Sequence, residues 1–229
     1  MTRSLGSLAA LLAGLYVFHY FAFPTYTHRF RLTFQVEVDG KLKEGSGVIT
    51  VYDQDNKWVP LTQKRWKRTS SGPSPWMDLG KRGMLLAAMR PYRASYEPRP
   101  HSVANLSFVA FFGGYHGSIG INSQTVQDIH KQTGKRRLKD DQLPEFIWLP
   151  NPQDPTSASI VQPEKFSEEI GNDVRFAGAY VEITTERPDN SLYEKLPWLA
   201  SIKKEQALSW HTITPEEFKL GAHNLLGDY

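Results

Sequence analysis

The chain has 229 residues, of which 40% are hydrophobic and 12% aromatic, and its formal net charge is +3 at pH 7. A chain of this length and composition builds one folded domain with appendages, which excludes a disordered protein and a pair of full-sized domains. It contains no cysteine, so disulfides, thiolate catalysis and cysteine metal sites are excluded as well.

The first element in chain order is an apolar segment at residues 5–23, LGSLAALLAGLYVFHYFAF, which has no formally charged side chain. As a helix rising about 1.5 Å per residue it spans about 28 Å, close to the hydrocarbon thickness of a bilayer. It predicts one N-terminal transmembrane helix, within a membrane anchor at residues 1–27. Two alternatives stay open: a buried core helix, and a cleaved signal peptide, although the aromatic exit at residues 21–26 lacks a small-residue cleavage site.

The charges that flank this segment are nearly balanced, with Arg3 before it and Arg29 and Arg31 after it. A short basic tail before a long downstream domain is typical of a signal-anchor, which favours the tail inside and residues 28–229 outside. We therefore expect a single-pass protein of the bacterial inner membrane with its globular part in the periplasm.

The chain after the anchor predicts a β-hairpin. Apolar and polar residues alternate over residues 30–38, as in a strand with one buried face. Asp39-Gly40 is a strong turn signal, and a second apolar strand follows it. The run Gly45-Ser46-Gly47 in this second strand indicates a bulge or a close backbone approach.

Residues 53–80 are rich in Lys, Arg, Ser, Pro and Trp and have no sustained periodicity, so we expect a long loop or insertion there. Short apolar runs predict two further strands, at residues 83–89 and 105–114. A short helix follows, with Asn122 or Ser123 as its N-cap and Gly134 after its end.

The last part of the chain continues this pattern of short elements. Strands are expected at residues 145–149 and within 173–186, and short helices near Pro163 and after Asn190 or Ser191. Because long helices and strands do not alternate, the fold class is mainly β, an antiparallel sheet or sandwich with short helical additions. The β domain is assigned to residues 28–199 and a C-terminal extension to residues 200–229.

A strong charge cluster lies between residues 57 and 101, where ten basic side chains meet only two acidic ones. At its centre a tryptophan is interleaved with basic residues, an arrangement that binds nucleic acid or anionic lipid headgroups. A periplasmic compartment disfavours nucleic acid and leaves membrane phospholipid, a cell-wall polyanion or an acidic envelope protein as partner. The predicted binding residues are Lys64, Arg65, Trp66, Lys67 and Arg68.

Two alternatives for this cluster need no external partner. It is equally consistent with a solvated loop whose long side chains cover apolar surface. Residues 151–229 carry thirteen acidic and seven basic side chains, so they could neutralise the cluster within the molecule.

The stretch FFGGYHGSIGIN at residues 111–122 concentrates glycines between an apolar run and the expected helix. It lacks the lysine of a phosphate-binding P-loop. The spacing of Gly114, Gly117 and Gly120 does not fit a dinucleotide-binding fingerprint either.

The same stretch differs from the nucleophile elbow G-x-S-x-G only at its first residue, where His116 takes the place of glycine. Ser118 and His116 are therefore candidate catalytic residues of a serine hydrolase, and the following helix start is a candidate anion site. The competing interpretation is a connecting loop whose glycines adopt positive φ.

No metal or cofactor site is predicted. The HEXXH and EF-hand patterns are absent, and the seven histidines are dispersed along the chain. The paired carboxylates lie in polar surroundings typical of solvated helix starts.

Four stretches, in this order, resemble a family of uncharacterised bacterial proteins that are membrane-anchored or exported and have no assigned function. The resemblance implies an exported domain with an apolar leader, whose framework includes a proline-rich segment and the strand after it. It implies no reaction, ligand or catalytic residue, and the basic segment at residues 57–82 departs from the family pattern. The stretches are RFRLTFQVEV with GSGVITV, LPEFIWLPNPQDPTSASIVQPEKF, VRFAGAYVEITTERP and EKLPWL.

The predicted function is a non-enzymatic, membrane-anchored interaction or envelope-associated module that uses residues 58–68 as its contact surface. The alternative is a small serine hydrolase or anion-ligand enzyme centred on residues 113–120.

Overall fold

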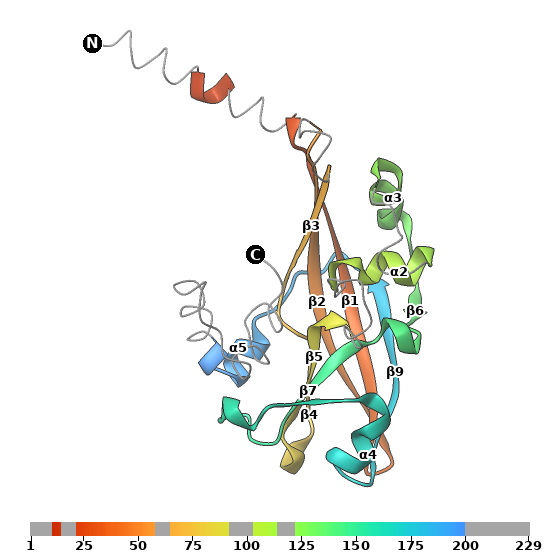
Figure 1. Cartoon of the computed structure of the whole chain (residues 1–229), viewed down its shortest axis with the longest axis vertical. Coiled ribbons are helices and arrows are strands. Elements are labelled where there is room, and N and C mark those ends of the chain that lie inside the picture. Colours follow the sequence, from red (N-terminus) through yellow and green to blue (C-terminus); the bar gives the residue numbers. More distant parts are fainter. Residues whose placement is uncertain (1–10, 15–21, 58–64, 92–102, 114–121, 200–229) are drawn as a thin grey trace, which may run out of the picture.

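The computed structural model of the chain describes residues 11–14, 22–57, 65–91, 103–113 and 122–199. Within these ranges the protein is mainly antiparallel β-sheet with short helices (Figure 1). The predicted fold class is confirmed to that extent. No helix among the described residues is long and apolar enough to cross a membrane. Most of the predicted N-terminal transmembrane helix, residues 5–23, lies outside the described ranges, so it stays a prediction.

The predicted hairpin is confirmed as the two longest strands, β1 (Thr25–Val38) and β2 (Lys41–Asp55). They pair without interruption from Val38 opposite Lys41 to Thr25 opposite Gln54. Asp39 and Gly40 both have positive φ, 53° and 72°, as the two central residues of a tight hairpin turn require. Asp-Gly therefore sets the register of the whole ribbon.

One antiparallel sheet joins the described strands in the order β6-β9-β1-β2-β4-β5-β7-β8, and β3 pairs with β2 beside this path. The long strand β1 lies between β2 and β9, so it is central in the sheet. The remaining strands are β3 (Trp66–Ser71), β4 (Trp76–Asp78), β5 (Met84–Pro91), β6 (Lys135–Arg137), β7 (Pro144–Leu149), β8 (Ser159–Val161) and β9 (Val174–Ile183).

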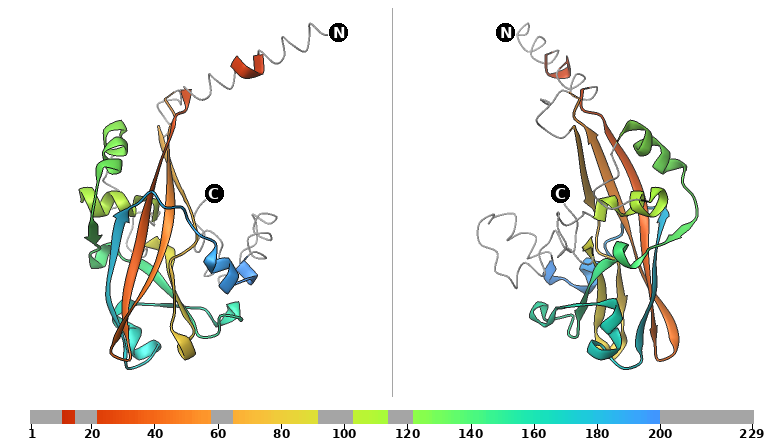
Figure 2. Two further views of the ribbon diagram at one scale, coloured as in Figure 1. Left: turned by 180° about the vertical axis from the view of Figure 1, so that it is seen from behind. Right: turned by 45° about the vertical axis from the view of Figure 1, so that its right-hand side comes forward.

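The short helices lie on two sides of the sheet (Figure 2). α2 and α3 cover one side near the upper half of β1, and α5 lies on the opposite side. The α-helices are α2 (Leu106–Phe112), α3 (Ser123–Asp128), α4 (Phe166–Glu169) and α5 (Ser191–Lys195). The 3-10 helices are η1 (Gly80–Arg82), η2 (Val103–Asn105), η3 (Ile129–Lys131), η4 (Asp140–Gln142), η5 (Pro155–Ser157) and η6 (Pro163–Lys165).

The main core is built from the alternate residues of β1 and β2 that face inward. In β1 this row runs through Phe30, Leu32 and Phe34, each of which is buried, while the intervening residues are mostly less buried. A second core covers the other face of β5 and β7, where Leu86 and Leu149 pack with Leu192 of α5. Because β5 is buried on both faces, its sequence MLLAAM is apolar without alternation.

The glycines of β2 permit a close approach, as predicted, and do not form a bulge. A Cβ on Gly45 would lie 2.5 Å from Cζ of Phe34 and 2.7 Å from the carbonyl oxygen of Trp76. The β1–β2 register is continuous through this point, and the irregularity lies instead between β1 and β9, at Gln35 and Val36. Gly45 thus makes room for the Phe34 ring in the core.

Two sequence predictions are wrong. Residues 53–80 are not one long loop, because β2 extends to Asp55 and the described part of the range also contains β3 and β4. Residues 105–114 do not form a strand, because Leu106–Phe112 is helix α2. Short apolar runs do not distinguish a buried strand from a buried helix, and four successive buried residues at 106–109 explain why this run had no visible period.

The other predicted elements are confirmed near their expected places. β5, β7 and β9 form the expected strands, and η6, α4 and α5 the expected helical turns. Asn122 is the N-cap of α3, where its side chain accepts a hydrogen bond from the backbone N–H of Thr125. β6 and β8 were not predicted.

Candidate functional site

The polar residues of interest lie at the end of the β1–β2–β3 ribbon where the N-terminal segment enters the domain (Figure 1). His28 continues the inward row of Phe30, and Asp53 and Asp55 continue the inward row of Ile49 and Val51. Period-two alternation therefore turns these three polar side chains toward the interior. We call His28, Asp53, Arg68 and Ser107 the buried polar cluster.

Arg68 of β3 is the direct cross-strand partner of Asp53 in β2. Its Nε donates a hydrogen bond of 2.5 Å to Oδ1 of Asp53, and its Nη1 donates one of 3.1 Å to the side-chain oxygen of Asn105. The guanidinium lies 3.6 Å from the centre of the Phe108 ring. The Arg68 and Asp53 side chains are only 5% and 0% exposed, so this ion pair belongs to the core.

His28 completes the cluster. Its Nε2 shares a hydrogen bond of 2.9 Å with Oγ of Ser107, while its Nδ1 lies 3.8 Å from Oδ2 of Asp53, too far for a hydrogen bond. Burial, followed by the nearby charge of Arg68, lowers the pKa of His28 from 6.5 to about 3. At neutral pH the imidazole is uncharged, so its contact with Asp53 is not an ion pair.

In space, His28 lies between Ser107 and Asp53, as the histidine does in a serine–histidine–aspartate triad. This geometry does not supply nucleophilic catalysis. Ser107 is completely buried, so no substrate reaches its hydroxyl. A histidine whose pKa is about 3 is a weak general base, and Asp53 does not hydrogen-bond to it. The described arrangement is a buried polar network rather than an active site.

A second ion pair joins Arg65, one residue before the start of β3, to Asp55, the last residue of β2. The guanidinium donates two hydrogen bonds, of 2.6 and 2.9 Å, to the two carboxylate oxygens of Asp55. Asp55 is fully buried, whereas the Arg65 side chain is 54% exposed. This hydrogen bonding raises the pKa of Arg65, so the pair is ionic and half of it faces the surface.

The predicted binding residues therefore divide between the interior and the surface. Arg68 is used internally, Arg65 and Lys67 are exposed, and Trp66 is half-buried. Lys64, and the candidate catalytic residues His116 and Ser118, lie outside the described residues. The alternative in which residues 151–229 neutralise the basic cluster holds for Arg82, which pairs with Asp173, whereas the ionic partners of Arg65 and Arg68 come from β2.

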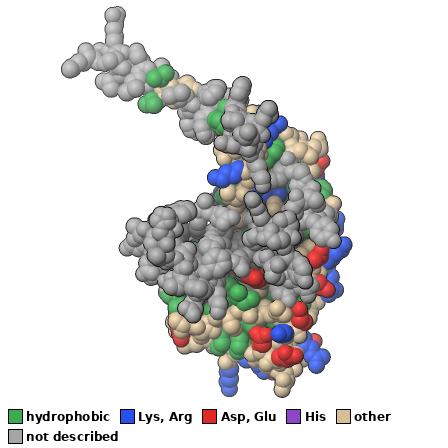
Figure 3. Space-filling model, in the orientation of Figure 1, with side chains coloured by type: hydrophobic (Ala, Val, Ile, Leu, Met, Phe, Trp, Pro, Cys, Tyr) green, Lys and Arg blue, Asp and Glu red, His purple; other side chains and the backbone are tan. Residues whose placement is uncertain are grey.

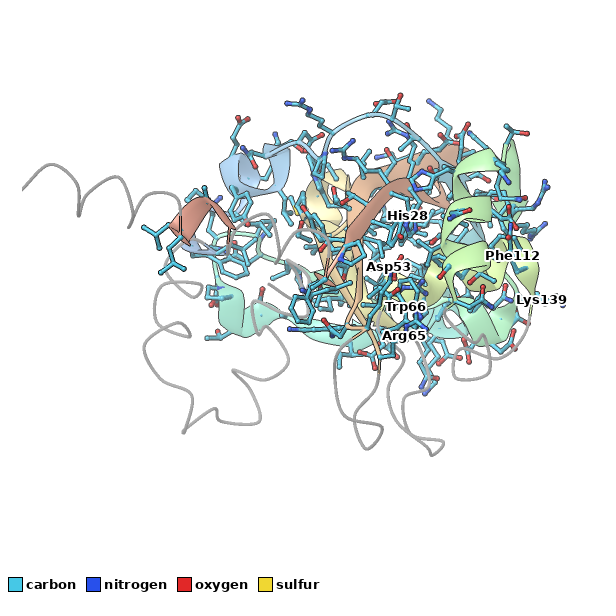
Figure 4. All side chains as sticks on the ribbon, turned by 90° about the horizontal axis from the view of Figure 1, so that it is seen from above. His28, Asp53, Arg65, Trp66, Phe112 and Lys139 are labelled. Atoms are coloured by element: carbon cyan, nitrogen blue, oxygen red, sulfur yellow. The ribbon has the colours of Figure 1, made fainter. Side chains whose placement is uncertain are left out.

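This end of the ribbon brings the chain directly after the apolar segment close to the basic cluster around Trp66. The backbone N–H of Asp55 donates a 3.0 Å hydrogen bond to the carbonyl of Pro24, directly after the apolar segment. The rings of Tyr26 and Trp66 lie 6.1 Å apart. Figure 4 shows Arg65, Trp66, Asp53 and His28 following one another across this end of the molecule. We call Tyr26, Arg65, Trp66 and Lys67 the tether surface.

A cavity of about 410 Å³ lies on the other side of β1 at the same end. β1, the end of β9 and the segment after α3 contribute its walls, and the buried His28 reaches it as well. Its lining residues are Thr27, His28, Arg29, His130, Gln132, Ile183, Thr184 and Thr185. No aspartate or glutamate is among them.

No group of three or more histidine, aspartate or glutamate side chains within the described ranges could hold a metal ion. His28 and His130 come near each other, with ring centres 6.1 Å apart, but no described carboxylate joins them as a third ligand. Sequence reasoning missed the buried polar cluster, although the alternation around Phe30 and Val51 carried the signal for His28 and Asp53.

Comparison with known proteins adds no relative to this description. No family model, no curated protein and no solved structure matches the chain. The family resemblance of its sequence stays a prediction, and any function must be inferred from the geometry described above.

Proposed function

We propose that the protein is a membrane-tethered, non-enzymatic module whose tether surface contacts anionic phospholipid headgroups. The apolar segment at residues 5–23 is its single transmembrane helix, in the bacterial inner membrane, and the β domain lies in the periplasm. The observation that carries the proposal is the position of Trp66 and Lys67 opposite the end of β2, where Asp55 hydrogen-bonds to Pro24 directly after the apolar segment.

The residue types of the tether surface suit a membrane interface. Tyrosine and tryptophan are favoured at the level of the headgroups, where one end of the ring is apolar and the other is hydrated. A lysine or arginine near an anionic bilayer gains about 1 kcal/mol. Lys67 and Arg65 are both exposed, and Figure 3 shows Lys and Arg side chains near this end of the β domain.

The buried polar cluster supports this surface from below. Arg68 and Asp53 hold β3 against β2, so that Trp66 stays beside Tyr26. Arg68 itself makes no contact with lipid, because its side chain is buried. The contact is therefore assigned to Arg65, Trp66 and Lys67, which lie at the start of β3 or directly before it.

The proposal is tested with the full chain reconstituted in nanodiscs with and without phosphatidylglycerol. Because the protein has no cysteine, single nitroxide labels can be attached without background. A label at Gln54→Cys reports on the tether surface, since Gln54 is opposite Lys67, and one at the exposed Leu42 reports on the far end. We expect phosphatidylglycerol to reduce the water accessibility of the first label only.

A matched pair of single variants separates this surface from general charge attraction. Lys67→Gln removes one charge at the tether surface, and Lys41→Gln removes one at the opposite end of the β1–β2 ribbon. We expect only the first variant to restore water accessibility at Gln54→Cys. Equal accessibility of the two labels in anionic nanodiscs, or release by the control variant alone, would show that another surface meets the partner.

A further inference from the structure

We propose that the cavity between β1 and the end of β9 binds a phosphate-class oxyanion. We call it the β1–β9 cavity. This inference goes beyond the contact of the tether surface with a bilayer, since it concerns other residues on a different side of β1, and it does not depend on that contact.

The cavity exists because β9 leaves β1 before β1 ends. The two strands pair from Val38 opposite Val174 to Phe30 opposite Ile183, and one more hydrogen bond follows, from the N–H of Thr184 to the carbonyl of Arg29 at 3.0 Å. The first residues of β1 have no ladder partner from β9. His130 and Gln132, after α3, lie across the opening as its other wall.

The chemistry of the lining favours an anion. Besides Ile183 it consists of one arginine, two histidines, three threonines and one glutamine, all of which can donate hydrogen bonds. Among the described residues, no carboxylate lines the cavity to repel an anion or to compete for the donors. A volume of about 410 Å³ is sufficient for a phosphate group with part of the molecule that carries it.

Arg29 is the main anchor in this proposal. Its Nε is buried and has no hydrogen-bond partner among the residues that the structure describes. Arg29 also lines the cavity, and a guanidinium matches the geometry of a phosphate. Arg31, two residues further along the same strand face, is instead paired with Glu186.

This contrast supplies a matched pair of variants. Arg29→Gln removes the cation that lines the cavity, and Arg31→Gln removes the neighbouring cation that is already paired. Both residues are arginines on the same face of β1. If an anion were held only by general electrostatic attraction, the two substitutions would weaken its binding equally. A third variant, Thr27→Val, removes one exposed hydroxyl from the rim without changing charge or strand propensity.

The oxyanion could come from free phosphate or from a phospholipid headgroup, since the cavity lies near the start of β1. We would titrate the full chain, in non-ionic detergent micelles, with inorganic phosphate in one arm and with short-chain phosphatidylglycerol in the other. Sodium chloride at matched ionic strength is the blank. Isothermal calorimetry gives the affinity, and the imidazole signals of His28 and His130 in NMR spectra give the location.

We expect at least one titrant to bind and to shift the imidazole signals, and the titrant that binds identifies the source. Arg29→Gln should weaken this binding at least tenfold, Thr27→Val two- to fivefold, and Arg31→Gln less than twofold. Thermal unfolding of each variant shows whether it remains folded; if Arg29→Gln does not, Thr27→Val alone decides.

The inference is overturned if the Kd of both titrants is above about 10 mM, which corresponds to a binding free energy weaker than about −3 kcal/mol. It is also overturned if Arg29→Gln and Arg31→Gln weaken binding equally, or if acetate binds while both phosphate compounds do not. None of these results bears on the tether surface, whose test uses other residues and another readout.

Discussion

The two halves of the β1–β2 ribbon use the same inward row of side chains for opposite purposes. Near the turn and in the middle, the row consists of apolar residues such as Phe34 and Ile49, which are fully buried in the main core. At the other end, near Thr25 and Asp55, it consists of His28, Asp53 and Asp55, which are just as buried. The change from one chemistry to the other occurs within a single alternation, between Val51 and Asp53.

This difference separates what stabilises the sheet from what fixes its arrangement. Apolar burial contributes about 25 cal/mol per Å² of buried area, whereas a buried ion pair recovers little more than the desolvation of its two charges. This end of the ribbon therefore gains specificity more than stability: Arg68 donates to one oxygen of Asp53, its cross-strand partner, while Oδ2 of Asp53 and Nη2 of Arg68 stay buried without a hydrogen bond among the described residues. The following predictions test this view, starting with the largest effect.

Breaking the buried ion pair from one side should have the largest effect. Arg68→Gln leaves the carboxylate of Asp53 buried without its cation, and we expect the free energy of unfolding to fall by about 3–5 kcal/mol. Replacing both partners, as Asp53→Leu/Arg68→Met, should recover most of this loss. Urea unfolding of the three proteins measures both effects, and a double variant no more stable than the single one would mean that the pair itself stabilises the fold.

The second prediction concerns acid. The pKa of His28 is lowered from 6.5 to about 3 in the folded state, so between these pH values the imidazole is protonated in the unfolded state and neutral in the folded one. The free energy of unfolding therefore falls as the pH drops from 6.5 toward 3, by about 1.4 kcal/mol per pH unit. His28→Gln should flatten that part of the stability curve, and parallel curves for the two proteins would contradict the burial of a neutral histidine.

The third prediction tests the apolar half. Gly45→Ala places a Cβ within 2.5 Å of the Phe34 ring and 2.7 Å of a backbone oxygen, and we expect overpacking to cost about 1–3 kcal/mol. Gly47→Ala is the matched control, because its nearest atom, Cα of Pro75, would be 3.1 Å away. Chemical denaturation should rank Gly45→Ala as the more damaging change; the reverse order would place the tight contact elsewhere.

The smallest effect is expected for Arg82, which forms ion pairs with Asp39 and Asp173 at the far end of the molecule. Its side chain is 29% exposed, against 5% for Arg68. Arg82→Gln should therefore lower the melting temperature much less than Arg68→Gln does, since water solvates the carboxylates that remain. Thermal unfolding compares it directly with Arg68→Gln, and equal losses would remove the distinction between the two ends.

The sequence predicted those parts of the fold that depend on local signals. The alternation around Phe30 and the Asp39-Gly40 turn were sufficient for the hairpin, and Asn122 was recognisable as an N-cap. Local signals failed where burial hides the period, as in helix α2, and where strands are only three residues long, as in β6 and β8.

The candidate site was predictable only in part. The basic and aromatic residues at 64–68 were visible in the sequence. Their division between core and surface depends on the pairing of β3 with β2. The sequence did not predict this pairing, because residues 53–80 were interpreted as a loop. The β1–β9 cavity is even harder to predict from the sequence, because three segments far apart in the chain line it.

The position of β1 has a mechanical consequence. The strand begins at Thr25, two residues after the apolar segment, and hydrogen-bonds to β2 along its whole length and to β9 from Phe30 onward. A pull transmitted through the N-terminal segment therefore acts along the strand axis, in shear. The hydrogen bonds on both sides of β1 share such a load at the same moment rather than opening one after another.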